Sequence, residues 1–161
     1  MSGRLLAGGL VLFALLFGVA LWWFQTYGFY QETARSEVMI AGAAIPVAEY
    51  RGIDADTSPL KLRSCFRAER IEGPAPEGPD PLVAPGWFDC FDAETLAKDI
   101  EAGAARAILA EFNAPYGFDR IVAQYPDGRA YQWRQINKCG TASFDGDPLP
   151  EGCPAKPAVE D

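Results

Sequence analysis

Apolar and polar positions divide the chain into two unlike parts. Leu5–Phe24 is a run of 20 residues without one charged or polar side chain. At about 1.5 Å per residue such a helix is about 30 Å long, which matches the hydrocarbon thickness of a bilayer. Aromatic side chains, which favour the membrane–water interface, lie at or just beyond its C-terminal end: Trp22, Trp23, Tyr27 and Tyr30. This pattern predicts an N-terminal transmembrane anchor within residues 1–31.

A cleaved secretory signal is the alternative interpretation of this segment. Leu5–Phe17 would be its apolar region, and Gly18–Ala20 resembles a small-x-small cleavage site. The apolar run continues through Leu21–Phe24, however, and bulky aromatic residues are unfavourable just after a cleavage site. We therefore expect a retained anchor, with Arg4 favouring a cytoplasmic N-terminus. In either case the rest of the chain is exported.

Small side chains form a stripe along one side of the expected helix. They lie at spacings of four and seven residues, at Gly3, Ala7, Ala14 and Gly18. Such a stripe lets a second helix approach closely in lipid. It predicts a second copy of the chain or another integral membrane protein as the partner, although glycine and alanine are common in any anchor.

Residues 32–153 show the shorter alternation of a small α+β domain, with one main helix on an antiparallel sheet of about four or five strands. Asp92 is a good N-cap for a helix over Ala93–Ala102. Phe118–Tyr125 and Arg129–Asn137 predict a hairpin, because the intervening Pro-Asp-Gly turn suits two antiparallel strands.

The remaining segments of the domain are less regular. Gln31–Gly42 has the pattern of a polar stalk that turns into a first weak strand, and Gly73–Pro85, with five prolines in 13 residues, predicts an exposed connector. Residues 154–161 predict a disordered tail. Further short strands are expected over Ile45–Tyr50 and Leu60–Arg67.

Composition changes this picture mainly by exclusion. The 161-residue chain contains no histidine, which excludes a histidine phospho-acceptor and a Ser-His-Asp or Cys-His catalytic pair. All 22 acidic residues and 13 of the 14 basic residues lie after residue 31, so the domain carries a formal charge of −9. Such an acidic domain predicts no nucleic-acid partner. No phosphate-binding glycine loop occurs, so we expect no nucleotide.

Four cysteines lie in the exported part and none in the apolar run: Cys65, Cys90, Cys139 and Cys153. An even number of cysteines on the exported side predicts two disulfides. Three connectivities are possible. We favour Cys65–Cys90 and Cys139–Cys153, because each pair closes a loop rich in proline and glycine. Zinc is the alternative, but no Cys-x-x-Cys knuckle is present.

The expected strand Leu60–Arg67 carries the strongest basic concentration in the acidic domain. Its members are Lys61, Arg63 and Arg67, followed by Arg70. Together with Trp133 they are the candidate partner surface, for an anionic ligand or protein. The alternative is a solvated strand face whose charges are offset by nearby carboxylates.

Two further segments offer weaker candidates. Asp89 and Asp92 are a pair of carboxylates in an aromatic segment and are the candidate residues for a carboxylate enzyme. Asp54–Ser58 resembles the start of a calcium loop, but Pro59 stands where that loop needs glycine. We interpret it as a turn with bonds from side chain to backbone. No catalytic, cofactor-binding or metal-binding residue is therefore assigned.

Several motifs together resemble an uncharacterised bacterial family of single-span membrane-anchored proteins with a four-cysteine extracytoplasmic domain. The motifs are Trp87–Ala93, Tyr125–Arg129, Gln135–Gly140 and Gly152–Pro154. The family carries only an unknown-function label, so the resemblance implies no catalytic residue. Some of its sequences are labelled histidine kinases, which a chain without histidine does not support. The resemblance implies a single-pass protein of the bacterial inner membrane with its C-terminal domain in the periplasm.

Three classes of function remain. The first is a non-catalytic accessory or assembly protein that docks on a larger membrane complex, for example a respiratory one. The second is a periplasmic ligand- or protein-binding module with an aromatic or basic contact surface. The third is the carboxylate enzyme. The missing chemistry favours the first, so we expect no enzymatic activity and no cofactor.

Overall fold

The computed structural model describes residues 3–157, which form two compact units. Contacts divide the chain between Tyr30 and Gln31, so each unit is described separately. This division lies one residue before the expected boundary at residue 31. The last four residues of the expected tail lie outside the described range, and 154–157 contain no helix or strand.

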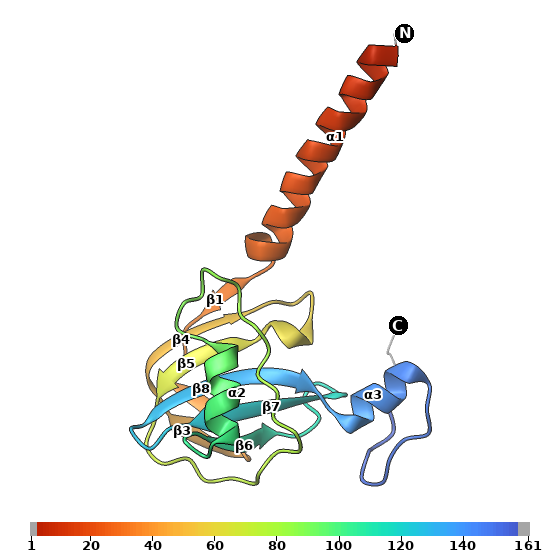
Figure 1. The fold of residues 1–161 in the computed structure, drawn as a ribbon. Coiled ribbons are helices and arrows are strands. Elements are labelled where there is room, and N and C mark those ends of the chain that lie inside the picture. The colour runs from red at the N-terminus through yellow and green to blue at the C-terminus, as the bar shows by residue number, and fades with distance from the viewer. Residues whose placement is uncertain (1–2, 158–161) are drawn as a thin grey trace. The chain divides into compact units, whose positions relative to one another are not determined.

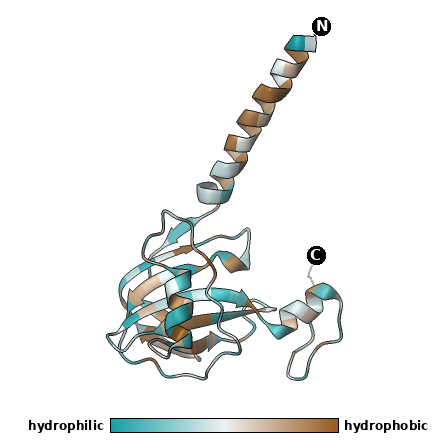
Figure 2. Cartoon of the chain, in the orientation of Figure 1, coloured by the Kyte–Doolittle hydropathy of each residue, from teal (hydrophilic) through white to brown (hydrophobic). Residues whose placement is uncertain are grey.

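The first unit is one long apolar helix. Helix α1 (Gly3–Trp23) continues as a π-helical segment, η1 (Phe24–Gly28), and none of their described side chains is buried. The segment is 26 residues long, and an 18-residue window within it has a mean hydropathy of 2.4, which makes it long and apolar enough to cross a membrane. Hydrophobic colours dominate α1 in Figure 2. An exported signal sequence meets the same criteria of length and composition, so both interpretations of this segment survive.

The second unit contains a six-stranded antiparallel sheet in the order β1-β4-β5-β8-β7-β6 and a separate hairpin, β2-β3 (Figure 1). This unit is α+β in class, as predicted, because it contains two α-helices in addition to the sheet. Its strands are β1 (Gln31–Thr33), β4 (Ala48–Asp54), β5 (Arg63–Arg67), β6 (Arg106–Glu111), β7 (Phe118–Gln124) and β8 (Arg129–Ile136). The hairpin strands are β2 (Glu37–Ile40) and β3 (Ala43–Pro46).

Two strand predictions need correction. Gln31–Gly42 is not a stalk, because it supplies β1, which pairs with β4, and β2 of the hairpin. The strand predicted from Leu60 begins only at Arg63. Pro59–Lys61 instead forms a short 3-10 helix, η2, whose first turn is capped by the Ser58 hydroxyl accepting from the Leu60 amide. Proline at the first helical position favours this turn over a strand.

Opposite faces of the sheet are covered by different elements. Because paired residues point to the same side of a sheet, register assigns Ser64, Gln132 and Val122 to one face. The hairpin covers this side, which we call the hairpin face: Val38 and Ile40 pack there in one cluster with Phe66, Ile71, Ile108, Ala110, Val122 and Ala130.

Helix α2 (Ala93–Glu101) crosses the other face, which we call the helix face (Figure 1). Register places Ile53, Arg63, Trp133 and Ile121 on this side. The helix begins as predicted, since the Asp92 carboxylate accepts from the Thr95 amide at 3.1 Å. Its buried residues are Ala93 and Leu96.

A second helix, α3 (Lys138–Asp145), follows β8 and was not predicted. Asn137 caps its start by accepting from the Gly140 amide, and Gly146 ends it with a left-handed backbone (φ 79°). Both end signals, Asn137 and Gly146, can be seen in the sequence. The segment between them is short and has few large apolar residues, so it shows no clear helical pattern. The helix is held by its surroundings rather than by its own amphipathic pattern.

Both favoured disulfides are present. Cys65–Cys90 ties β5 to the chain that enters α2, and Cys139–Cys153 ties α3 to the following loop. The proline-rich Gly73–Pro85 between the first two cysteines is not simply an exposed connector, because its backbone is bonded to the sheet. The Leu109 amide donates to Pro74 O at 2.8 Å, and the Gln135 carboxamide bonds both Gly78 O and the Asp80 amide.

Candidate functional site

The structure contradicts the candidate partner surface at Trp133 and Arg63. Trp133 is 0% exposed, and Arg63 is 4% exposed. Both lie on the helix face, where Phe91 packs edge-on against Trp133 at 6.4 Å between ring centroids. The indole Nε1 donates to Gln135 Oε1 at 3.1 Å. Trp133 is therefore a core residue, and the pattern failed because both sides of this strand are covered.

Arg63 is a structural cation rather than a surface one. Its Nε donates to Leu82 O at 2.7 Å, and Nη1 donates to Leu60 O at 2.8 Å and Leu62 O at 2.6 Å. Nη2 reaches Val83 O at 3.3 Å. A buried guanidinium is tolerated when its donors are satisfied in this way. Arg63 thereby fastens the proline-rich segment to the sheet.

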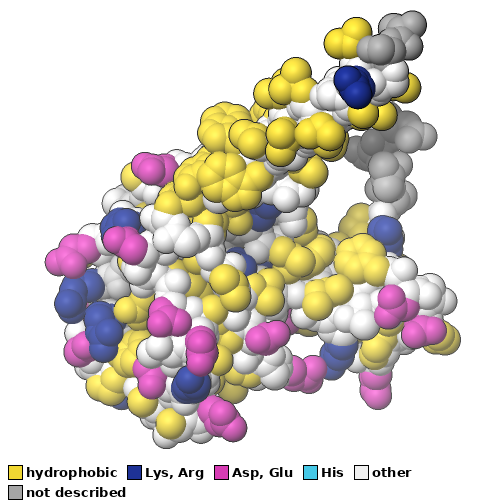
Figure 3. All heavy atoms as spheres, turned by 45° about the horizontal axis from the view of Figure 1, so that its top comes forward, with side chains coloured by type: hydrophobic (Ala, Val, Ile, Leu, Met, Phe, Trp, Pro, Cys, Tyr) yellow, Lys and Arg dark blue, Asp and Glu magenta, His cyan; other side chains and the backbone are white. Residues whose placement is uncertain are grey.

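The other basic residues remain accessible but do not form one patch. Arg67 pairs with Glu49 at 3.2 Å, and Arg70 pairs with Glu72 at 2.5 Å. Lys61 lies in η2, where its Nζ donates to Thr57 Oγ1 at 3.4 Å. The alternative of solvated side chains offset by neighbouring carboxylates describes these residues better than a continuous docking surface. Figure 3 likewise shows basic and acidic side chains interspersed on one side of the domain.

The candidate carboxylates Asp89 and Asp92 are both exposed and serve separate contacts. Asp89 pairs with Arg51 at 2.9 Å. Bonds from the backbone and hydroxyl of Thr95 hold the pKa of Asp92 below its usual value. A catalytic carboxylic acid at neutral pH needs the opposite shift, produced by burial. These two residues therefore lack the environment of a general acid and its partner.

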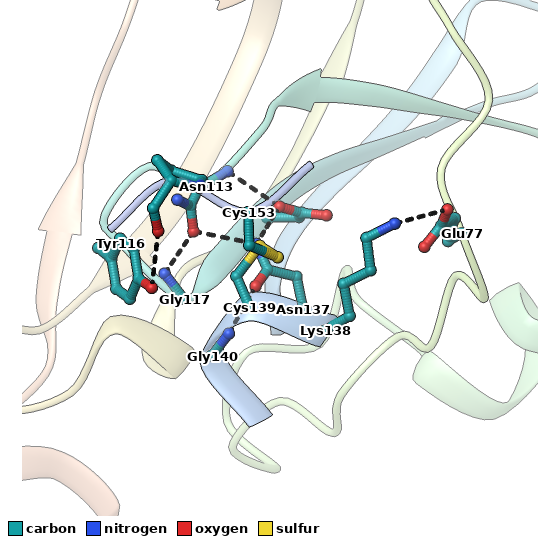
Figure 4. Close-up of a disulfide and its surroundings, with 11 residues drawn as sticks. Glu77, Asn113, Tyr116, Gly117, Asn137, Lys138, Cys139, Gly140 and Cys153 are labelled. Atoms are coloured by element: carbon teal, nitrogen blue, oxygen red, sulfur yellow. Dashed lines mark hydrogen bonds and ion pairs between the residues drawn. A yellow bond between two sulfur atoms is a disulfide. The ribbon is translucent and has the colours of Figure 1, made fainter. Parts of the chain in front are cut away.

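The second disulfide belongs to a dense structural region (Figure 4). Asn137 donates to Asp119 Oδ1 at 2.6 Å, and the Asn113 amide donates to the same oxygen at 2.9 Å. Gly140 approaches Gly117 so closely that a Cβ on Gly140 would lie 2.2 Å from Gly117 O. The polar groups here are paired with one another, which is the behaviour of a satisfied internal network.

A different site, missed in the sequence, lies on the hairpin face. A cavity of about 110 Å³ is lined there by Arg35, Glu37, Met39, Arg120, Gln132 and Arg134. Gln132 is only 2% exposed, so it belongs to the floor, whereas the first three residues are exposed and form the rim. Three basic side chains thus meet around one small space.

The cavity is unusual in its hydrogen bonding. Within residues 3–157, five buried side-chain atoms lack a protein partner: Thr33 Oγ1, Tyr50 OH, Arg120 Nε, Gln132 Nε2 and Arg134 Nε. The last three belong to residues that line the cavity. Buried polar groups are normally paired, so such a concentration requires an explanation.

Carboxylates that do not line the cavity hold Arg120 and Arg134 in position through ion pairs. Arg120 Nη2 lies 2.6 Å from Glu111 Oε2 and donates to Met39 O at 2.9 Å. Arg134 Nη1 contacts both carboxylate oxygens of Asp54, at 3.0 and 3.2 Å. The Ser64 hydroxyl donates to Gln132 Oε1 at 3.1 Å, which turns the amide nitrogen of Gln132 away from that contact.

Metal ligation has no support among residues 3–157, where no group of three or more Cys, Asp or Glu side chains could hold an ion.

The small-residue stripe Gly3, Ala7, Ala14 and Gly18 falls on α1, and open space surrounds Gly3 and Gly18. Whether a second helix packs against that stripe stays a prediction.

An apolar N-terminal helix followed by a disulfide-linked α+β domain defines the class of protein. The model of a family of unknown function, DUF6446, matches residues 34–154, and the chain belongs to this family. The match confirms the resemblance drawn from the cysteine and turn motifs, and it begins after α1. Comparisons with curated proteins and with solved structures found no match.

Proposed function

We propose that this chain is a non-catalytic accessory or assembly protein, anchored by α1 in the bacterial inner membrane with its domain in the periplasm. In this role it docks on a larger membrane complex, for example a respiratory one. The observation that carries the proposal is the fully exposed apolar helix. An 18-residue window within it has a mean hydropathy of 2.4, and no side chain of α1 is buried.

Lipid is the environment that suits such a helix, because exposure of this much apolar surface to water is unfavourable. The two disulfides support export of the domain, since disulfides persist in oxidising compartments. Domain and anchor are separated by only Phe29 and Tyr30. The domain would therefore work close to the membrane in which its partner resides.

Docking through the anchor is supported by the small-residue stripe. Gly18 lies on the stripe, whereas Gly9 is nine residues away, which is two and a half helical turns and therefore the opposite side of α1. Neither glycine has any atom within 4 Å of an added Cβ, so leucine fits at both positions. The two substitutions are a matched pair, because both replace glycine by leucine within the apolar run and they occupy opposite sides of the helix.

The test is native electrophoresis of native membranes solubilised in a mild detergent. The unaltered chain is expected in a large assembly. Gly18→Leu should release it, and Gly9→Leu should not. Migration of the unaltered chain only as a monomer would contradict docking. A mature N-terminus at Leu21, measured by mass spectrometry, would contradict the anchor.

The second candidate function is a periplasmic binding module. One observation favours it, the arginine-lined cavity on the hairpin face with its buried, unpartnered donors. The contact surface would then be Arg35, Arg120, Gln132 and Arg134 in place of the buried Trp133 and Arg63. Thermal stabilisation of the domain by a ligand tests this alternative.

A further inference from the structure

The hairpin face places like charges against each other. Arg120 and Arg134 are direct cross-strand neighbours in the register of β7 and β8, and like charges in that relation destabilise a sheet. Burial lowers the pKa of Arg120; the ion pair with Glu111 opposes this shift, and the positive charges of Arg134 and Arg35 add to it. The fold therefore maintains a local arrangement that costs free energy.

The same residues carry donors that the protein leaves unused. Arg134 bonds Asp54 and Pro59 O through Nη1 alone, so among the described residues its Nε–H and Nη2 edge has no hydrogen-bond partner. Gln132 uses its oxygen for Ser64, and its buried Nε2 has no partner. Arg120 likewise has an unpartnered Nε. An acceptor-only group in the cavity would match these unused donors.

A carboxylate has the geometry and capacity for these donors. Its two oxygens accept about four hydrogen bonds and fit the parallel N–H groups of one guanidinium edge. The cavity of about 110 Å³ has room for a compact group and not for a large molecule. The exposed rim, formed by Arg35 and Met39, gives access from solvent.

Charge balance favours a single negative charge. Glu111 and Asp54 already neutralise Arg120 and Arg134 from outside, which leaves Arg35 without an ion pair to any described residue. Glu37 also lies on the rim and would repel additional negative charge. A monoanionic carboxylate is thus better matched than a dianion such as phosphate.

We propose that the cavity bounded by Arg35, Arg120, Gln132 and Arg134 is a binding site for one carboxylate group. The carboxylate belongs either to a small organic acid or to the C-terminus of a peptide. The site is built entirely within the domain and does not depend on the role of α1.

The experiment uses the full chain in detergent micelles and titrates it with sodium acetate, with sodium chloride and sodium phosphate at matched ionic strength. Thermal unfolding and calorimetric affinity are the readouts. Acetate should raise the unfolding temperature more than either other salt. Arg35→Gln, a rim substitution, should weaken acetate binding by about three- to ten-fold, because one charge-assisted hydrogen bond is lost.

Two further variants separate the site from general effects of charge. Arg134→Lys keeps the positive charge and removes the paired N–H edge, and it should weaken binding at least as much as Arg35→Gln. Arg70→Gln removes an exposed arginine that pairs with Glu72 away from the cavity and should bind acetate normally. Acetate should also shift the Nε–H resonances of Arg120 and Arg134.

Specific results would overturn the proposal. These are equal stabilisation by acetate and chloride, equal affinity in all variants, stronger stabilisation by phosphate, or unchanged arginine Nε–H resonances. A tripeptide with a free C-terminus and its amidated form distinguish the sources of the carboxylate. Tighter binding of the free tripeptide than of acetate assigns the site to a peptide terminus, and binding of acetate alone assigns it to a small acid. Equal binding of the amidated form would contradict both.

Discussion

Two faces of one sheet bury arginine in opposite ways. On the helix face, Arg63 donates to four backbone carbonyls and holds the proline-rich segment in place. On the hairpin face, Arg120 and Arg134 stand opposite each other, and each keeps a buried Nε without a protein partner. The same type of side chain therefore has every guanidinium nitrogen engaged on the helix face and keeps unsatisfied donors on the hairpin face.

The difference teaches which buried charges to associate with function. A satisfied guanidinium is explained by the packing that it holds together. An unsatisfied one opposes folding, and natural sequences tend to break such local rules at functional sites. The sequence did not distinguish the satisfied arginine from the two unsatisfied ones, because each of the three lies next to an apolar residue in a segment with the pattern of a strand.

The largest expected effect comes from the disulfide that closes the helix face. Replacing Cys65 and Cys90 by serine together should lower the free energy of unfolding by about 3.5 kcal/mol, because the unfolded chain regains the freedom of a long loop. The loop spans 25 residues, against 14 for Cys139–Cys153. The matched double serine variant at Cys139 and Cys153 should lose about 3.0 kcal/mol. Denaturant unfolding measures both, and a larger loss at the second pair would reverse the order.

A smaller effect directly contrasts the two kinds of buried arginine. Arg63→Met should lower the free energy of unfolding by about 2 kcal/mol, since buried carbonyls lose their donors. Arg134→Met should change it by less than about 1 kcal/mol, because removing an opposed charge offsets the lost ion pair. Urea unfolding of both variants checks the comparison. Equal losses at the two positions would show that the faces do not differ in this respect.

The smallest effect concerns the cap of α2 and depends on pH. The pKa of Asp92 is lowered from its ordinary value of 3.8 by the bonds from Thr95. Its contribution is therefore complete above pH 3.8 and is lost as the pH falls through the lower pKa of the folded state. Asp92→Ala should lower the unfolding temperature at neutral pH and make it less sensitive to acid below pH 4.

Asp89 is the matched control for this measurement. It is an exposed aspartate three residues earlier, where it forms only a surface ion pair with Arg51. Such pairs contribute little, so Asp89→Ala should leave the acid dependence of the unfolding temperature nearly unchanged. If the two variants behave alike, the cap of α2 is not the cause.

Much of the architecture could be predicted because its signals are local. The apolar run, the capped helix after Asp92 and the hairpin around Pro126–Gly128 each depend on residues within a few positions. The disulfide pairing also followed from loop closure between near neighbours in the chain. Helix α3 was missed since its cap signals accompany no clear apolar stripe.

The candidate site could not be predicted in the same way. Arg120 and Arg134 become neighbours through the register of β7 and β8, but Arg35 joins them only through the hairpin that packs over the sheet. The basic residues that are close in sequence, Lys61, Arg63 and Arg67, were instead separated. Alternation places Lys61 and Arg63 on one side, yet a 3-10 turn and a covering segment give them different environments.

The sequence by itself determined where the chain is apolar enough for a membrane and which short segments start and end the main helix and hairpin, and it favoured one of three cysteine pairings. These properties depend on composition and on contacts between near neighbours. Tertiary structure alone decided which basic side chains are buried, which are satisfied and which face a shared cavity. The burial and hydrogen bonding of a side chain depend on the element that packs over its face of the sheet. The sequence of a single strand does not show which element covers either face.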